Sequence, residues 1–73
     1  MPKDPTEGLL IIVIQTAAGR IYFDGNGKRF RIGSKISDPD VKAFSNANGQ
    51  WSFFIYSDSY WYCNFMDPGN GMW

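Results

Sequence analysis

The side chains that most often carry catalysis are scarce in this chain. It has no histidine, the commonest general base and metal ligand, and its one cysteine, Cys63, therefore has no Cys–His partner. Asp38 and Asp40 flank Pro39, and a pair of carboxylates could carry out acid–base chemistry. The same residues are typical of a helix start, and we adopt that interpretation. We predict no catalytic residue and no enzymatic activity.

Two glycine-rich segments resemble metal or phosphate sites. Asp24-Gly25-Asn26-Gly27 begins like a calcium-binding loop, but Lys28 occupies the fifth position and no distal glutamate follows. Gly69-Asn70-Gly71 lacks the strand, glycine loop and helix that surround a phosphate. We interpret both segments as turns, and we predict neither a metal site nor a cofactor.

Basic residues concentrate in the middle of the chain. Residues 20–35 contain five basic residues and one acidic residue, a local charge of +4, whereas the whole chain has a net charge of zero. A candidate basic face consists of Arg20, Tyr22, Lys28, Arg29 and Arg31. Basic residues beside an aromatic ring suit a nucleic-acid backbone with one stacked base. The alternatives are a solvated strand face and a surface for acidic proteins.

Aromatic residues concentrate further along, because eight of the 15 residues from 51 to 65 are aromatic. A second candidate surface consists of Phe54, Tyr56, Tyr60 and Tyr62. Tyrosine-rich surfaces suit protein partners, and they also suit sugar rings or bases by stacking. The alternative is that a helix of the same chain, or a second copy in a homodimer, covers this surface.

The first half of the chain predicts strands. Residues 9–16 form a β-branched run that is apolar on both faces, which is typical of a central strand or of a strand covered on both sides. Asn26-Gly27 predicts a type I′ turn in a hairpin over residues 20–33. In that hairpin Phe23 would face Phe30 on the core side, and Tyr22 would face Arg31 on the other side.

The second half predicts a short helix near residues 39–48 and a hairpin over residues 51–66. Asp38 is the expected N-cap and Gly49 the expected stop of the helix, whose Val41 and Phe44 would cover part of the sheet. A three-residue loop at 57–59 would pair Tyr56 with Tyr60. The predicted core face of that hairpin is Trp51, Phe53, Ile55, Trp61, Cys63 and Phe65.

Length and composition indicate one small folded domain. We predict an α+β, mainly β domain over residues 1–73, with a flexible tail at 1–7, about five mainly antiparallel strands and one short helix; a partly closed barrel is the alternative. A single cysteine favours a reducing compartment. Residues 1–8 lack the pattern of a signal peptide, and the apolar run 9–14 is too short to cross a bilayer. A cytoplasmic protein that does not act on membranes is therefore expected.

These observations favour a non-catalytic protein-binding module, such as a small stand-alone inhibitor or adaptor of phage or mobile-element type. Its partner would be a protein that contacts Phe54, Tyr56, Tyr60 and Tyr62. Two alternatives remain open at this stage. They are single-stranded nucleic-acid binding through the basic hairpin 20–33, and carbohydrate binding on the tyrosine-rich surface.

Overall fold

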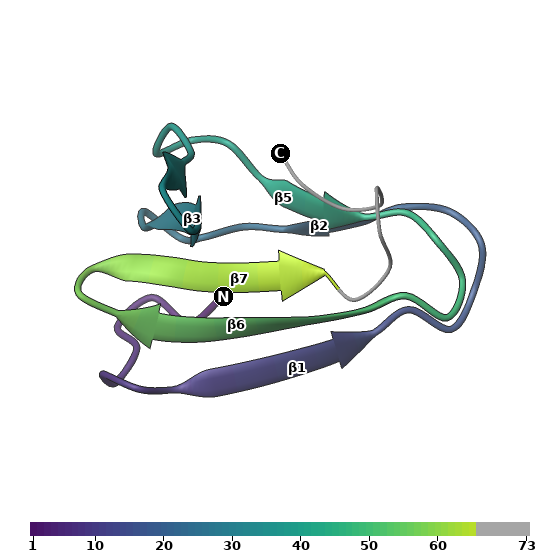
Figure 1. Ribbon diagram of the computed structural model, residues 1–73, viewed down its shortest axis with the longest axis horizontal. Coiled ribbons are helices and arrows are strands. Elements are labelled where there is room, and N and C mark those ends of the chain that lie inside the picture. Colours follow the sequence, from purple (N-terminus) through teal and green to yellow (C-terminus); the bar gives the residue numbers. More distant parts are fainter. Residues whose placement is uncertain (66–73) are drawn as a thin grey trace.

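The computed structural model describes residues 1–65, except for the Phe65 side chain, and every regular element in that range is a strand. The strands, drawn in Figure 1, are β1 (Leu10–Ile14), β2 (Ile21–Phe23), β3 (Arg29–Ile32), β4 (Lys35–Ile36), β5 (Ala43–Ser45), β6 (Trp51–Ser57) and β7 (Tyr60–Phe65). The mainly β prediction is confirmed. Residues 1–65 contain no helix that is long and apolar enough to cross a membrane.

The strands form two sheets. The larger sheet has the order β1-β6-β7-β3-β4, and the smaller sheet pairs β2 with β5 (Figure 1). All neighbours are antiparallel except β3 and β7, which run parallel, so the larger sheet is mixed. Parallel neighbours need a long connection between them, and here the chain from β4 through β5 to β6 provides it.

The predicted hairpin over residues 20–33 is wrong, although its turn is formed. Asn26 and Gly27 have φ angles of 56° and 92°, and the Lys28 N–H donates to the Gly25 carbonyl at 3.1 Å. The flanking strands nevertheless separate, because β2 pairs with β5, and β3 pairs with β4 and β7. The separation lets Phe23 and Phe30 both contact Phe54, at ring-centroid distances of 4.8 Å and 6.0 Å. Burial of these rings outweighs the local strand pairing.

The predicted helix near residues 39–48 is also wrong. The Val41 N–H donates to the Asp38 carbonyl at 3.3 Å, and after this turn the chain extends into β5. Ser37 ties the segment to β3, because its N–H donates to the Phe30 carbonyl and its hydroxyl accepts from the Phe30 N–H, both at 2.9 Å. Ala43 and Ser45 are buried whereas Lys42 is exposed, which is the period of a strand.

The hairpin of β6 and β7 exists, but its predicted three-residue loop is wrong. The loop has two residues, Asp58 and Ser59, whose φ angles of 52° and 69° resemble a type I′ turn. Tyr56 consequently pairs with Trp61, and Phe54 pairs with Cys63. Because side chains alternate along a strand, this one-residue change exchanges the two predicted faces of β6, whereas Trp61 and Cys63 on β7 stay on the core side as predicted.

The core lies between the two sheets. Its buried hydrophobic side chains are Phe23, Phe30, Ala43, Phe54, Trp61 and Cys63. At one end the buried Gln15 joins the layers: its Oε1 accepts from the Ser45 hydroxyl at 2.5 Å, and its Nε2 donates to the Ala17 and Gly19 carbonyls at 2.8 Å. These bonds satisfy polar groups that would otherwise be costly to bury.

Candidate functional site

The surface that stands out is the side of the larger sheet that faces away from β2 and β5, here called the outer face. Cross-strand partners share a face, and the register pairs Leu10 with Ile55, Ile12 with Phe53 and Ile14 with Trp51. The outer face therefore carries Leu10, Ile12, Ile14, Trp51, Phe53, Ile55 and Ser57 on β1 and β6, and Arg29, Arg31, Ile36, Tyr60, Tyr62 and Asn64 on β3, β4 and β7.

The β1 side of the outer face is aliphatic and strongly exposed. Leu10, Ile12 and Ile14 keep 53%, 56% and 62% of their surface exposed. Of the large hydrophobic side chains that are exposed in the described part of the chain, only Tyr22 lies elsewhere. Full burial of such a side chain is worth about 1.5–3 kcal/mol, so roughly half of that remains available to a partner at each position. Soluble monomers seldom leave such side chains contiguous on one surface.

The opposite side of the outer face is aromatic and cationic. Parallel pairing places Arg29 beside Tyr60 and Arg31 beside Tyr62. The Arg31 guanidinium carbon lies 5.3 Å from the Tyr60 ring centroid and 5.4 Å from that of Tyr62. Its Nε also donates to the Gly33 carbonyl at 2.7 Å. Arg31 is therefore held in place by cation–π contacts and one hydrogen bond. Its side chain loses less conformational entropy when a partner binds.

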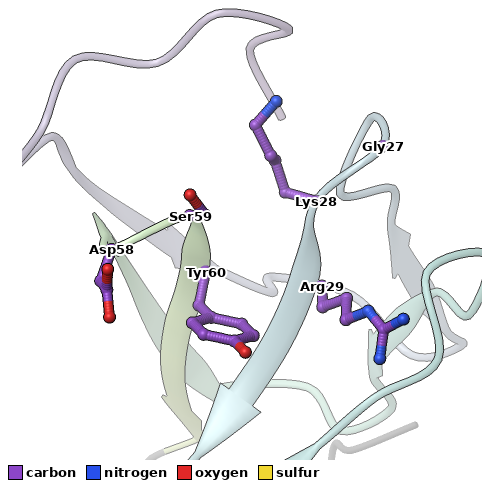
Figure 2. A pocket seen from close by; sticks show the side chains of 6 residues that line it. All are labelled: Gly27, Lys28, Arg29, Asp58, Ser59 and Tyr60. Atoms are coloured by element: carbon purple, nitrogen blue, oxygen red, sulfur yellow. The ribbon is translucent and has the colours of Figure 1, made fainter.

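An open depression of about 490 Å³ lies at the end of this cationic side, where two turns meet. Its lining residues, labelled in Figure 2, are Gly27, Lys28, Arg29, Asp58, Ser59 and Tyr60. In that view the side chains of Lys28, Arg29 and Asp58 point away from one another. Such an arrangement does not converge on a small ligand, because tight small-molecule sites are concave and direct several polar groups inward.

The four residues predicted for the tyrosine-rich surface are divided between two sides. Tyr60 and Tyr62 lie on the outer face, with their rings 6.1 Å apart. Phe54 is fully buried, and Tyr56 packs on Trp61 at 5.3 Å against the core. The change of loop length is the reason for this division, since it reverses the side on which each residue of β6 lies relative to the prediction.

The five predicted basic-face residues are divided as well. Arg29 and Arg31 join the tyrosines on the outer face, and Lys28 lies at the adjacent turn. Arg20 instead covers the Phe44 ring at 4.4 Å, and Tyr22 pairs with Phe44 on the smaller sheet. The two predicted surfaces thus contribute to one shared surface.

Sequence reasoning missed the aliphatic half of the outer face. It assigned Trp51 and Ile55 to the core, whereas they are 41% and 38% exposed. It assigned residues 9–16 to a central strand because both faces are apolar, whereas β1 is an edge strand. The sequence of residues 9–16 does not distinguish an edge strand from a central strand, because an edge strand with an apolar outer face has the same hydrophobic pattern as a buried strand.

Reactive groups are sparse in the described part of the chain. Burial raises the pKa of the Cys63 thiol to about 12, so the thiolate is not formed at neutral pH. Residues 1–65 contain no cluster of three or more potential metal ligands. No protein-family model matches the chain, and comparison with curated proteins and with solved structures gives no match. The function is therefore argued from the chemistry of the surface.

Proposed function

We propose that this chain is a non-catalytic protein-binding module and that the outer face is its binding surface. The observation that carries the proposal is the exposed stripe of Leu10, Ile12 and Ile14 beside Trp51 and Ile55. A role as a small inhibitor or adaptor follows, because such a surface acts by covering part of another protein. A cytoplasmic location remains a prediction from the sequence.

The chemistry of the outer face favours a protein partner over the alternatives. The side chains of Leu10, Ile12 and Ile14 offer neither hydrogen-bonding groups nor flat rings, so they suit the apolar side chains of a protein better than bases or sugars. Aromatic residues and arginine, which contribute most to protein interfaces, lie beside them as Trp51 and Arg31. We expect the partner to present an apolar patch with carboxylates at the edge that meets Arg29 and Arg31.

The proposal is tested by capture from host extract with a matched pair of variants. Ile55→Lys places a charge within the outer face, and Tyr22→Lys places the same charge at an exposed hydrophobic position of the smaller sheet. We expect one protein to be retained by the wild type and by Tyr22→Lys and to be lost with Ile55→Lys. With that protein purified, titration should give a dissociation constant at least about tenfold weaker for Ile55→Lys alone. Equal binding by all three proteins would contradict the proposal.

A second candidate function rests on a different part of the outer face. The Arg31 guanidinium, which contacts both the Tyr60 and the Tyr62 ring, has Arg29 and Lys28 nearby. This resembles the combination of cations and stacking platforms that binds single-stranded nucleic acid. An oligonucleotide titration at about 50 mM salt separates the two functions. Nucleic-acid binding predicts loss with Tyr62→Ala and no loss with Ile12→Lys. Absence of binding at this salt concentration would end this alternative.

Carbohydrate binding is less well supported by the surface. Trp51 is exposed and could stack on a sugar, but its cross-strand neighbour is Ile14, and the adjacent Ile12 is also aliphatic. Sugar recognition needs hydrogen-bonding groups around the ring, and these positions supply none from their side chains.

A further inference from the structure

We propose that two copies of this chain pair edge to edge through β1, antiparallel about a two-fold axis at Ile12, to form one continuous sheet. This inference concerns the backbone edge of β1. It is independent of the partner that the outer face binds, and it holds or fails whatever that partner is.

The first observation is that one edge of β1 pairs with no other strand among residues 1–65. This strand is the terminal strand of the larger sheet, and it lies at the border of that sheet in Figure 1. Beyond β1 the Gln15 N–H donates to the Gln50 carbonyl at 2.8 Å, and the Gln15 carbonyl accepts from Gly49 at 2.7 Å. Backbone groups alternate in direction along an antiparallel strand. Val13 and Ile11 therefore also face β6, whereas the N–H and C=O groups of Leu10, Ile12 and Ile14 point outward.

The second observation is that this edge carries none of the usual protection against pairing. Residues 8–19 contain no charged residue and no proline. The other border strand of the same sheet, β4, has only two residues, and one of them is Lys35. A short strand with a lysine discourages pairing, whereas a longer apolar strand invites it. The difference identifies β1 as the edge that accepts a further strand.

The third observation is that the outward groups match their own copy. Leu10, Ile12 and Ile14 are spaced evenly about Ile12, so a two-fold axis there places Ile12 opposite the partner's Ile12 and Leu10 opposite the partner's Ile14. Every outward N–H and C=O of these residues then finds a complementary group. Their side chains lie on the outer face and meet as aliphatic cross-strand pairs.

A second copy can pair at this edge without repulsion between like charges. Pairing across a two-fold axis brings each side chain near its own counterpart, and any charge close to the axis would meet a like charge. Residues 8–19 supply no such charge, so self-pairing meets no repulsion. The strand is about 17 Å long, and pairing along it buries less than a standard protein interface. We therefore expect a reversible dimer that depends on concentration.

Opposite charges at the axis provide the test. Ile12 is 56% exposed, so Ile12→Lys and Ile12→Glu are expected to fold. In sedimentation equilibrium each variant alone should dimerise at least about tenfold more weakly than the wild type, because like charges meet at the axis. An equimolar mixture of the two variants should dimerise again, because the pair across the axis then has opposite charges.

Controls distinguish the edge from the outer face. Ile55→Lys changes the outer face one strand away from the edge, and Tyr22→Lys changes the smaller sheet. Both should dimerise like the wild type. The proposal is overturned by a wild type that stays monomeric up to about 1 mM, by Ile12→Lys dimerising like the wild type, by a mixture that stays monomeric, or by loss of the dimer in Ile55→Lys.

Hydrogen exchange tests the same pairing without any substitution. When the protein concentration rises, the amides of Leu10, Ile12 and Ile14 should exchange more slowly, because pairing gives them acceptors. The amides of Ile11 and Val13 already face β6, and their exchange should not depend on concentration. Equal exchange of the two sets at all concentrations would overturn the proposal.

Discussion

Replacing each of two adjacent phenylalanines by alanine tests the register on which the outer face depends. Phe54 is fully buried, and its ring lies 4.8 Å from Phe23 and 6.0 Å from Phe30. Phe53 is the same residue type one position earlier, but it lies on the outer face opposite Ile12 and is only partly buried. The two substitutions remove the same atoms from opposite sides of one strand, so the difference between them reports the burial of each side.

The expected magnitudes differ widely. Truncation of a buried phenylalanine costs about 3–5 kcal/mol, which includes the loss of ring contacts worth about 0.5–1.5 kcal/mol each. A chain of 73 residues has a total stability of about 4–11 kcal/mol. Phe54→Ala should therefore remove about a quarter of the stability or more. Phe53→Ala should cost about 1 kcal/mol, because much of its ring surface is not in the core.

Urea unfolding followed by far-ultraviolet circular dichroism measures both values. With a slope of about 1 kcal/mol/M for a protein of this size, Phe54→Ala should lower the midpoint by about 3–5 M or unfold the protein without denaturant. Phe53→Ala should lower it by about 1 M. Phe54→Leu, which keeps part of the volume, provides an intermediate value if Phe54→Ala does not fold. A larger loss for Phe53→Ala than for Phe54→Ala would refute the two-residue loop and the outer face with it.

Three further outcomes follow from the turn and from two titratable groups. Because Asp58 and Ser59 both have positive φ, the double substitution Asp58→Asn and Ser59→Gly should raise the free energy of unfolding by roughly 0.5–1 kcal/mol, measured by urea unfolding; a loss of stability would contradict the type I′ geometry. The Cys63 thiol, whose pKa is raised to about 12, should not react with a thiol reagent at pH 8 until urea unfolds the chain, and prompt reaction in the native protein would show that it is accessible. A hydrogen bond from the Ser57 side chain, and then the Asp58 N–H, lower the pKa of the exposed Glu7 carboxyl below 4.5. Because these hydrogen bonds favour the charged carboxylate, they stabilise the folded chain above pH 4.5, and this stabilisation is lost as pH falls through the lowered pKa. Glu7→Gln should therefore flatten the pH dependence of the thermal midpoint in acid. An unchanged acid profile would exclude this role.

Local chemistry could be predicted from short segments of the sequence. Asn26-Gly27 forms the expected turn, because its φ angles depend on residues in immediate contact. The interpretation of Cys63 as a small buried residue is likewise confirmed. The β-branched and aromatic composition was enough to predict a mainly β domain.

The predictions that failed all depend on distant partners. Asp38-Pro39-Asp40 suits a helix start and also suits the turn that is formed. The bonds of Ser37 to Phe30 and the pairing of β5 with β2 favour the extended path into β5. The hairpin over 20–33 failed for the same reason, since Phe23 and Phe30 reach Phe54 from two different sheets. Burial of aromatic surface involves residues far apart in sequence. It contributes more free energy than the local preferences for a helix after Asp38 and for a hairpin over residues 20–33.

The sequence by itself determined that this chain has no histidine and one cysteine, a basic middle segment and more apolar residues than one small core absorbs. The tertiary structure decided which side of each strand is core. The hydrophobic pattern favours the three-residue loop, which pairs apolar residues with apolar residues, whereas the structure has the two-residue loop, which pairs Phe53 with Asn64. The contact of Phe54 with Phe23 of the second sheet belongs to the two-residue loop, and the same register leaves Leu10, Ile12, Ile14 and Trp51 exposed. The location of the candidate site therefore depends on the register of β6 with β7. Contacts between the two sheets set that register, and the residues of the site do not.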